Sequence, residues 1–517
     1  MPATSPLPPL WIAIHLPQLA LEVFHPRWLA KLGRDCSIVV CDNKVVCAVS
    51  ESARQAGIVL GMRHSSVGLL SLEALIKERD TELEQALRQK VAITLLQYSP
   101  QVTYADEHHN IILIEVAASL RLFGGIRCLY RRLQDNLQKL GLSAQFGIAR
   151  NASAATIFSQ QYRRNFYQRT RSLHICLGQK HLTRHLDVIS CQFLPAAAKQ
   201  HDWLRGIACE QLGALRQLPR AGLQRRCGKA LLQALDTAYG KHPEFHQWLE
   251  VPAQFDARCE LPDRIDNTDT IFHYARGLIL QLCGWLQAQQ SAVKKIHLYL
   301  GHERGRQAVA PTLLPIQLAQ ASWQEAHLTH LLKERLGQLS LKAAAISLHL
   351  QAAEIERRQA HSECLFPDSR HQTEDQTRLI ELLIARLGAE QVLQAAPQAD
   401  HRPEVANRWV SVIEKIKPSA AMNAALKNFT NPRPSWLLEQ AQVLSVRQHS
   451  PYYGSKLTLL SSAERIEAGW WNGQLVTRDY FIATCNQHFR YWIYRERIGN
   501  AQRMHEDEVW FLHGFFG

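Results

Sequence analysis

Hydrophobic and polar positions in residues 10–165 alternate between strand-like and helix-like periods. An apolar run opens this stretch, and apolar residues later recur at i, i+3 and i+4 spacing, for example at Leu83, Leu87 and Val91. In chain order, the pattern predicts a strand at 10–16 with a short helix ending near Phe24, a helix at 80–97, a hairpin of 102–105 with 111–116, a helix at 126–140 and a strand at 143–148. This part is therefore predicted to be a mixed α/β region.

The rest of the chain changes pattern several times. Residues 166–248 are mostly helical and basic, and 254–353 alternate in the order strand, helix, strand, strand, helix, strand. A polar linker is predicted at 354–374, a helical connector at 375–431 with a helix at 375–394, a strand-rich aromatic region at 432–517, and a disordered tail at 1–9. The prediction is an α+β multidomain protein.

Charge favours a polyanionic partner, since 59 Lys and Arg residues stand against 46 Asp and Glu residues, a formal charge of +13. The twelve cysteines include no CxxC pair, which argues against a zinc ribbon and a disulfide framework. Neither a signal peptide nor an apolar run long enough for a membrane span is seen. We expect a cytoplasmic protein, associated with the nucleoid and not with a membrane.

Several motifs occur in the order found in Y-family (translesion, UmuC-like) DNA polymerases. They are the apolar strand that leads to Glu22, the segment around Arg54, and Gly147-Ile148-Ala149-Arg150-Asn151. The chain therefore resembles this family. The resemblance implies a palm and fingers at 10–165 (fingers at about 23–80), a thumb with a helix–hairpin–helix at 166–248, and a βαββαβ little finger at 254–353.

The carboxylates that hold catalytic metal ions in the family do not match. Ala13 stands at the first metal-binding Asp, and His15 follows two residues later. Aligning the hairpin through Glu115 puts Asn110 and Ile111 at the Asp-Glu pair; aligning its first strand puts His108 and His109 there. Because Mg²⁺ prefers oxygen ligands and two-metal catalysis needs clustered carboxylates, neither register restores the site.

Two other possibilities bear on this site. Asp106-Glu107 could serve as the pair only if the strand slipped by about two residues, which burial of one face disfavours. His15, His108 and His109 could be imagined as a metal site, but turn histidines on a surface are far more common. We expect no metal and no cofactor. Arg54 matches a triphosphate contact, yet Glu51 replaces its usual Tyr partner, so an ion pair is an equal alternative.

DNA-binding positions are predicted in both downstream domains. Residues 212–228 read as helix, tight turn, helix, where Gly222 would let a phosphate approach the backbone. Arg220, Arg225, Arg226 and Lys229 would contact phosphates without regard to sequence. Lys294 and Lys295, with Arg304 and Arg306 nearby, would do so from the little finger. Primer–template DNA is the expected ligand.

Further motifs resemble one subfamily, the ImuB-type proteins of the bacterial mutasome, which are thought to be non-catalytic. They are Leu122-Phe123-Gly124-Gly125, residues 399–404, Gly469-Trp470-Trp471 and residues 510–517. The resemblance implies damage-induced, error-prone translesion synthesis with a sliding clamp, a RecA-like protein and an error-prone C-family polymerase. Leu365 and Phe366 in the linker match part of a clamp-binding motif. Trp470, Trp471, Trp510 and Phe515 are the candidate partner-binding residues.

Two alternatives stay open at this point. One is an active, divergent translesion polymerase. The other is a protein-interaction module that never touches DNA, because a basic excess also promotes solubility alone.

Overall fold

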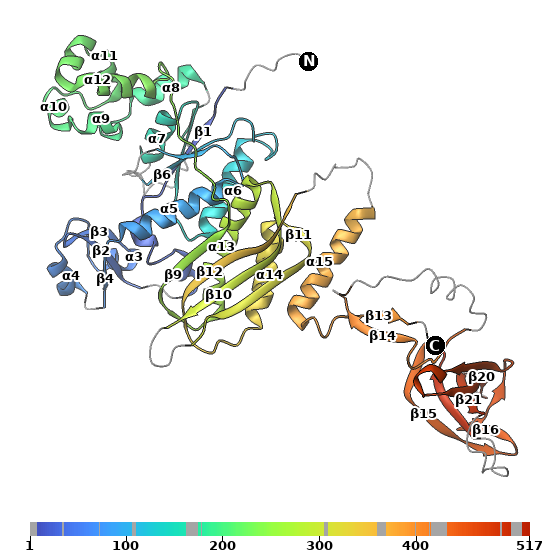
Figure 1. Cartoon of the computed structure of the whole chain (residues 1–517). Helices are drawn as coiled ribbons and strands as arrows, with labels where there is room; N and C mark the ends of the chain where they lie inside the picture. Colours follow the sequence, from blue (N-terminus) through green and yellow to red (C-terminus); the bar gives the residue numbers. More distant parts are fainter. Residues whose placement is uncertain are drawn as a thin grey trace, which may run out of the picture. The chain divides into compact units, whose positions relative to one another are not determined.

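The structure is a computed structural model. It describes residues 8–33, 36–71, 73–105, 110–161, 174–176, 178–303, 309–358, 369–398, 400–412, 414, 432–485, 489–497 and 509–517. The chain divides into two compact units, Met1–Leu382 and Leu383–Gly517. Figure 1 follows the elements along the chain.

A five-stranded sheet, in the order β5-β6-β1-β7-β8, forms the centre of the first unit. Its middle strand, β1 (Trp11–His15), is antiparallel to both neighbours, and four of its five residues are buried because helices cover the sheet. The other strands are β5 (Val102–Tyr104), β6 (Ile111–Glu115), β7 (Gln145–Ala149) and β8 (His174–Cys176), and the helices are α5 (Thr81–Leu95), α6 (Ile126–Lys139) and α7 (Ala152–Gln161). The elements predicted for this region are confirmed.

A smaller three-stranded sheet precedes α5. It has the order β3-β2-β4, and a cluster of small apolar side chains fills one of its faces. Its elements are β2 (Ile38–Asp42), β3 (Val45–Val49), α3 (Glu51–Gln55), α4 (His64–Leu70) and β4 (Leu75–Glu78), with α1 (Leu19–Glu22) and α2 (Trp28–Lys31) before them.

Short helices follow β8, as the sequence predicted. They are α8 (Gln179–Asp187), α9 (Pro195–Ala198), α10 (His201–Gly206), α11 (Leu212–Gln217) and α12 (Arg220–Ala238). Their buried leucines continue the apolar core that begins under β1. Within α12, Gly228 has φ 80° and ψ 174°, so the helix is two segments joined by a kink.

A second α/β layer has the predicted βαββαβ order, and its sheet runs β11-β10-β12-β9. Its elements are β9 (Asp256–Ile265), α13 (Thr268–Ala288), β10 (Ser291–His302), β11 (Thr312–Ser322), α14 (Glu325–Gly337) and β12 (Ala345–Arg357). The predicted start of the linker at residue 354 is wrong. Strand β12 continues to Arg357, because its polar end still pairs with β10.

Helix α15 (Ser369–Leu387) also differs from prediction, since it starts inside the expected linker and ends before residue 394. It stops where Gly388 takes φ +91°, the left-handed conformation that ends many helices. The helical connector is wrong beyond this point, because β13 (Leu393–Pro397) and β14 (Asn407–Ser411) form a hairpin.

The last region is strand-rich, as predicted, and its antiparallel sheet runs β17-β16-β15-β22-β21-β20-β18. Aromatic side chains form much of its interior. Its strands are β15 (Trp436–Arg447), β16 (Ser450–Tyr453), β17 (Ser455–Lys456), β18 (Thr458–Leu459), β19 (Glu464–Ala468), β20 (Val476–Thr484), β21 (Arg490–Glu496) and β22 (Trp510–Phe515). Among the helices of the described residues, none is both long and apolar enough to cross a bilayer.

Candidate functional site: the buried Ala13 position and two exposed surfaces

Ala13 lies at the centre of the main sheet and is fully buried. It is paired with Leu113 on β6 and with Gly147 on β7. Two residues further, His15 is paired with Ile111 and Gln145, and its Nδ1 lies 3.3 Å from the Gln145 side-chain oxygen. Residue 13 therefore presents a methyl group, and residue 15 presents an imidazole that already contacts a side-chain amide.

Helix α7 closes the face of the sheet to which Ala13 belongs. Residues directly opposite in antiparallel strands point to the same side. A Cβ atom on Gly147 would lie 2.1 Å from the carbonyl oxygen of Ala155 and 2.5 Å from the amide nitrogen of Ser159, so α7 touches the strand backbone there. Ala13 also belongs to the core cluster that contains α7 residues. A carboxylate at residue 13 would thus be buried among apolar groups.

The hairpin supplies no replacement within the described residues. Ile111 is fully buried, and the carbonyl of Asn110 accepts a hydrogen bond of 2.8 Å from the Leu16 amide. The alternative ligands Asp106, Glu107, His108 and His109 lie outside the described residues. In the part of the chain that is described, no group of three or more His, Cys, Asp or Glu side chains could hold a metal ion.

Glu22 and Glu115 are carboxylates of the described residues near β1, and both are engaged by the fold. Glu22 accepts hydrogen bonds from the backbone amide (2.9 and 3.0 Å) and the hydroxyl of Ser143. Burial raises its pKa above the ordinary value, against the opposing effect of these hydrogen bonds. Glu115 accepts hydrogen bonds from the amides of Leu10 (2.9 Å) and Ala117 (3.0 Å). Each carboxylate thus has a structural role in holding backbone amides.

Arg54 forms the ion pair that was one of its two predicted roles. Its Nη1 lies 3.1 Å from Glu51 Oε2 on α3, whose N-cap is Ser50. Both side chains are about half exposed, so the pair contributes little to stability. Glu51 partly offsets the charge of Arg54 at this position.

The predicted helix, tight turn and helix at 212–228 are present as α11, Leu218-Pro219 and α12. Gly222 is exposed, and nothing lies within 4 Å of the place where a Cβ would be, so the backbone there is open to approach. Arg220 differs from expectation: it forms a two-pronged ion pair with the buried Asp236, with one contact at 3.0 Å. This hydrogen bonding lowers the pKa of Asp236 and partly neutralises Arg220.

Three other basic residues of α12 face solvent: Arg225, Arg226 and Lys229. The guanidinium carbon of Arg226 lies 5.7 Å from the ring centre of Trp203, a cation–π contact that fixes its position. These charges and the open backbone at Gly222 make one basic surface on the helical region after β8, which we call the α12 surface.

The predicted lysines of β10 are not free cations. Lys294 lies 3.5 Å from Glu356, and Lys295 lies 3.9 Å from Glu354, both on the neighbouring strand β12. Because these carboxylates offset their charge, we expect weaker phosphate contacts here than at the α12 surface. Arg304 and Arg306, like Leu365 and Phe366 of the candidate clamp motif, fall outside the described residues.

The four candidate aromatic residues of the C-terminal unit divide into two pairs. Trp470 and Trp471 are 74% and 52% exposed, and their rings meet edge to face at 5.5 Å. Trp510 is 4% exposed in the apolar core, and Phe515 packs against that same core. Phe515 is only partly buried, so its contact role stays a prediction, whereas the prediction is wrong for Trp510 as an exposed contact. Strand alternation explains this, since Trp510 and Leu512 share the inner face of β22.

Arg402 packs against the ring of Trp471, a role that the sequence did not predict. Its guanidinium is bonded to Asp400 (2.7–3.2 Å) and to the Gln474 side chain (3.3 Å), and it lies 5.8 Å from the Trp471 ring centre. A side chain on Gly469 would collide with Arg402, at 2.9 Å. The motif at 399–404 and the Gly-Trp-Trp motif, both noticed in the sequence, are thus two halves of one structure.

Comparisons with known proteins agree with the resemblance seen in the sequence. Residues 22–160 match the impB/mucB/samB family. Two curated relatives, each named Protein ImuB, from strains NA1000/CB15N and ATCC 19089 of Caulobacter vibrioides, are 21% identical over 483 residues, covering 89% of this chain and 100% of the relative.

Solved structures with similarity to the chain are Y-family polymerases. A Dbh ternary complex is 15% identical with a TM-score of 0.36, covering 66% of this chain and 98% of its own. DinB from Sulfolobus solfataricus is 14% identical with a TM-score of 0.35, covering 68% of this chain and 100% of its own.

Proposed function

We propose that this chain, with its impB/mucB/samB region at residues 22–160, is a non-catalytic Y-family homologue that holds primer–template DNA in damage-induced, error-prone translesion synthesis. The observation that carries the proposal is the closed face of the sheet at Ala13. Two-metal phosphoryl transfer requires clustered carboxylates open to the substrate. Here the first position is a buried methyl group, and the nearby Glu22 and Glu115 bind backbone amides.

A primer-extension assay tests the absence of catalysis. The purified chain is incubated with primer–template DNA, all four deoxynucleotides, and Mg²⁺ or Mn²⁺. No extension is expected with either metal. Template-dependent extension that disappears when Asp106 and Glu107 are replaced by Asn and Gln would contradict the proposal and exclude a contaminating polymerase.

DNA binding is proposed for the α12 surface. Each Lys or Arg that neutralises a phosphate contributes about 0.9 to the slope of log K against log salt concentration on duplex DNA. Reversing Arg225 and Arg226 to Glu should therefore weaken binding and reduce that slope by about 2. Arg408→Glu, at an exposed arginine of the C-terminal unit, is the matched control. An unchanged slope in the double variant would exclude the α12 surface as the DNA contact, and salt-insensitive or undetectable binding by the native chain would favour a module that does not bind DNA.

Recruitment is the second part of the proposed role. We propose that Trp470 and Trp471 contact a RecA-like protein or an error-prone C-family polymerase. Arg402 contacts Trp471, which in turn packs edge to face against Trp470, so the two exposed indoles form a rigid apolar contact. Trp470→Ala with Trp471→Ala should abolish recovery of at least one of these partners in a pull-down. Phe489→Ala removes another exposed aromatic side chain and serves as the control. Full recovery of both partners by the double variant would refute this part.

Clamp binding is proposed for Leu365 and Phe366 from sequence. Two apolar side chains in a polar segment suit docking into a groove of a sliding clamp. Leu365→Ala with Phe366→Ala should abolish clamp pull-down while leaving DNA binding intact. Retained clamp binding would exclude this motif.

A further inference from the structure

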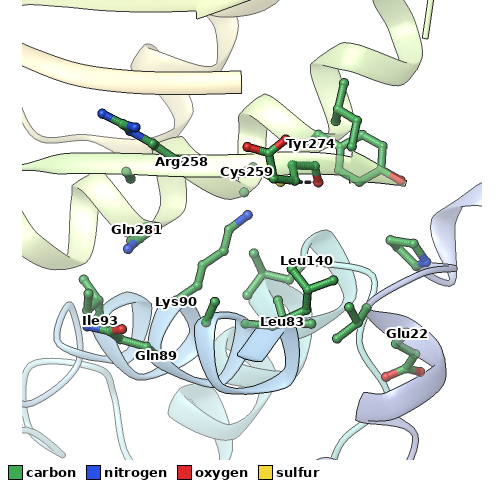
Figure 2. Close-up of a pocket in the computed structure, with 18 of the residues that line it drawn as sticks. Glu22, Leu83, Gln89, Lys90, Ile93, Leu140, Arg258, Cys259, Tyr274 and Gln281 are labelled. Atoms are coloured by element: carbon green, nitrogen blue, oxygen red, sulfur yellow. Dashed lines mark hydrogen bonds between the residues drawn. The ribbon is translucent and has the colours of Figure 1, made fainter. Parts of the chain in front are cut away.

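A cavity of about 680 Å³ lies in the first unit between helix α5 and the elements β9 and α13. Figure 2 shows its two sides: α5 with Leu83 and Ile93 on one, and Arg258, Cys259 and Tyr274 on the other. Most of its lining is aliphatic or aromatic. It is separate from the palm position at Ala13 and from the α12 surface.

The two sides of the cavity are fixed by close helix packing. A Cβ on Gly284 of α13 would lie 2.0 Å from the carbonyl oxygen of Ile93 on α5, so the helices touch through backbone atoms. Lys139 of α6 reaches Glu325 of α14 at 2.6 Å, and Trp28 stacks on His273 of α13 at 4.8 Å. These contacts hold the cavity open as a formed groove.

Strand β9 presents an open sheet edge to this groove. It pairs only with β12, at Asp256–Glu260 and at Ile265, and within the described chain no backbone group pairs with its outer edge between residues 256 and 261. The opposite edge of the same sheet is covered, because two amides of β11 donate to the buried Glu381 of α15. Folded proteins usually protect such edges. At β9 Pro262, which lacks an amide donor, limits pairing, and it lies beyond residues 256–261, whose outward backbone groups stay available for a further strand.

Lys90 gives the groove a charge preference. Its side chain rises from α5 into the cavity (Figure 2), where its ammonium lies 2.8 Å from the place that a Cβ on Gly277 would occupy. No carboxylate in the described residues forms an ion pair with it. Of the three carboxylates that line the cavity, Asp256 is bonded to His349 and Gln351, Glu22 is bonded to Ser143, and Glu260 lies on β9 itself. A half-buried cation without a counter-charge favours an acidic ligand group.

We propose that this groove receives an extended segment of a partner protein, which pairs with Asp256–Leu261 as an added strand. Its apolar side chains would face the α5 wall, and an Asp or Glu side chain would meet Lys90. Strand addition obtains affinity from backbone hydrogen bonds and specificity from pockets for alternate side chains, and this groove has both. The proposal is independent of DNA binding and of the absence of catalysis.

Selection from a peptide library tests the charge preference. The full chain is immobilised and exposed to octapeptides that alternate Val, Leu, Ile or Phe with Glu, Asp, Ser or Lys; bound peptides are identified by mass spectrometry. Acidic sequences should be enriched. Lys90→Glu should reduce their binding at least tenfold and enrich Lys-containing sequences instead, while Lys90→Met should lose selectivity without reversing it. No enrichment by the native chain, or enrichment that both variants leave unchanged, would overturn the proposal.

Backbone methylation of the best peptide tests strand addition itself. A strand pairs along one edge, so only every second amide donates to β9. N-methylation of the peptide residues whose amides face β9 should abolish binding. N-methylation of the intervening residues, whose amides face away, should leave binding intact. Equal effects of the two methylation patterns would mean an apolar pocket without strand pairing. Concentration-dependent dimerisation of the free chain that the peptide reverses would mean that a second copy is the occupant, which also contradicts a foreign partner.

Discussion

Ala13→Asp restores the residue type that the polymerase family uses at this position, and it tests whether any metal pocket survives. The side chain would enter the apolar core under α7, beside Leu113 and opposite a glycine whose Cβ position is 2.1 Å from another backbone. Full burial typically raises a carboxyl pKa by about 3 units, which corresponds to about 4 kcal/mol of lost stability at pH 7. Ala13→Asn has nearly the same size and no charge, and overpacking alone should cost it about 1–3 kcal/mol.

The difference between the two variants should depend on pH. The folded state of Ala13→Asp holds its proton more tightly than the unfolded state, so the variant loses stability as pH rises from the unfolded pKa, about 3.9, to the raised folded value. Below about pH 4 the Asp and Asn variants should be similarly stable, and at pH 7 the Asp variant should be less stable by a few kcal/mol.

Urea unfolding followed by tryptophan fluorescence, at pH 4 and pH 7 and with or without 10 mM Mg²⁺ or Mn²⁺, measures these effects. Equal stability of the two variants at pH 7, or a selective gain of the Asp variant with metal, would refute the conclusion that the site is closed. Either result would mean that residue 13 reaches solvent or a metal ion.

Three further predictions concern the packing around these surfaces. Glu381→Gln should lower the free energy of unfolding of the first unit by about 2–4 kcal/mol, because the charged group that bonds two strand amides and His327 (2.6 Å) is lost. Differential scanning calorimetry measures the loss. An unchanged melting temperature would contradict the role of Glu381 in covering the β11 edge. Gly284→Ala should separate α5 from α13, since its Cβ would lie 2.0 Å from the Ile93 carbonyl oxygen. Limited proteolysis should then cut faster in the segment that joins the five-stranded sheet to the sheet that contains β9. A native cleavage pattern would show that the helices do not touch. The pKa of Asp479 is lowered chiefly by its hydrogen bond from an arginine of β19. The stability that this bond contributes is therefore present above about pH 4 and is lost as pH falls through the pKa of the folded state. Asp479→Asn should remove this acid dependence in urea unfolding curves measured across pH, and unaltered curves would exclude the ion pair as the cause of the acid dependence.

Periodicity in the sequence sufficed for most elements of the first unit, including the βαββαβ order. It failed where a polar run still pairs, at the end of β12, and where a single glycine ends a helix, at Gly388. The end of β12 is set by pairing with a neighbouring strand, and the end of α15 by a local backbone angle. Neither feature alters the pattern of apolar positions along the chain.

Site residues show the same division. The family resemblance predicts a metal-binding carboxylate where the sequence has Ala13, but only the packing of α7 shows that the space around this residue is closed. The sequence placed Arg220 among phosphate-binding residues, but Asp236, sixteen positions later and beyond a kink, partly neutralises it. An ion pair of this kind depends on how two helical segments meet, which residue types alone do not specify.

The two tryptophan-containing motifs, Gly469-Trp470-Trp471 and residues 510–517, were assigned the same partner-binding role from sequence, and the fold places their tryptophans differently. Alternation along β22 buries Trp510, while two glycines with positive φ, Gly469 and Gly473, turn the chain so that Trp470 and Trp471 face solvent. The groove beside β9 could not be read from sequence at all, because α5 and β9 are more than 160 residues apart along the chain.

By itself, then, the sequence determined the kinds of element, their order, the basic charge and the presence of an alanine at residue 13, because these follow from residue type and short-range spacing. The tertiary structure decided which charges are already paired, which aromatic rings are exposed and which sheet edge is open. These properties depend on distances between residues remote in sequence, and those distances exist only once the helices and sheets have packed.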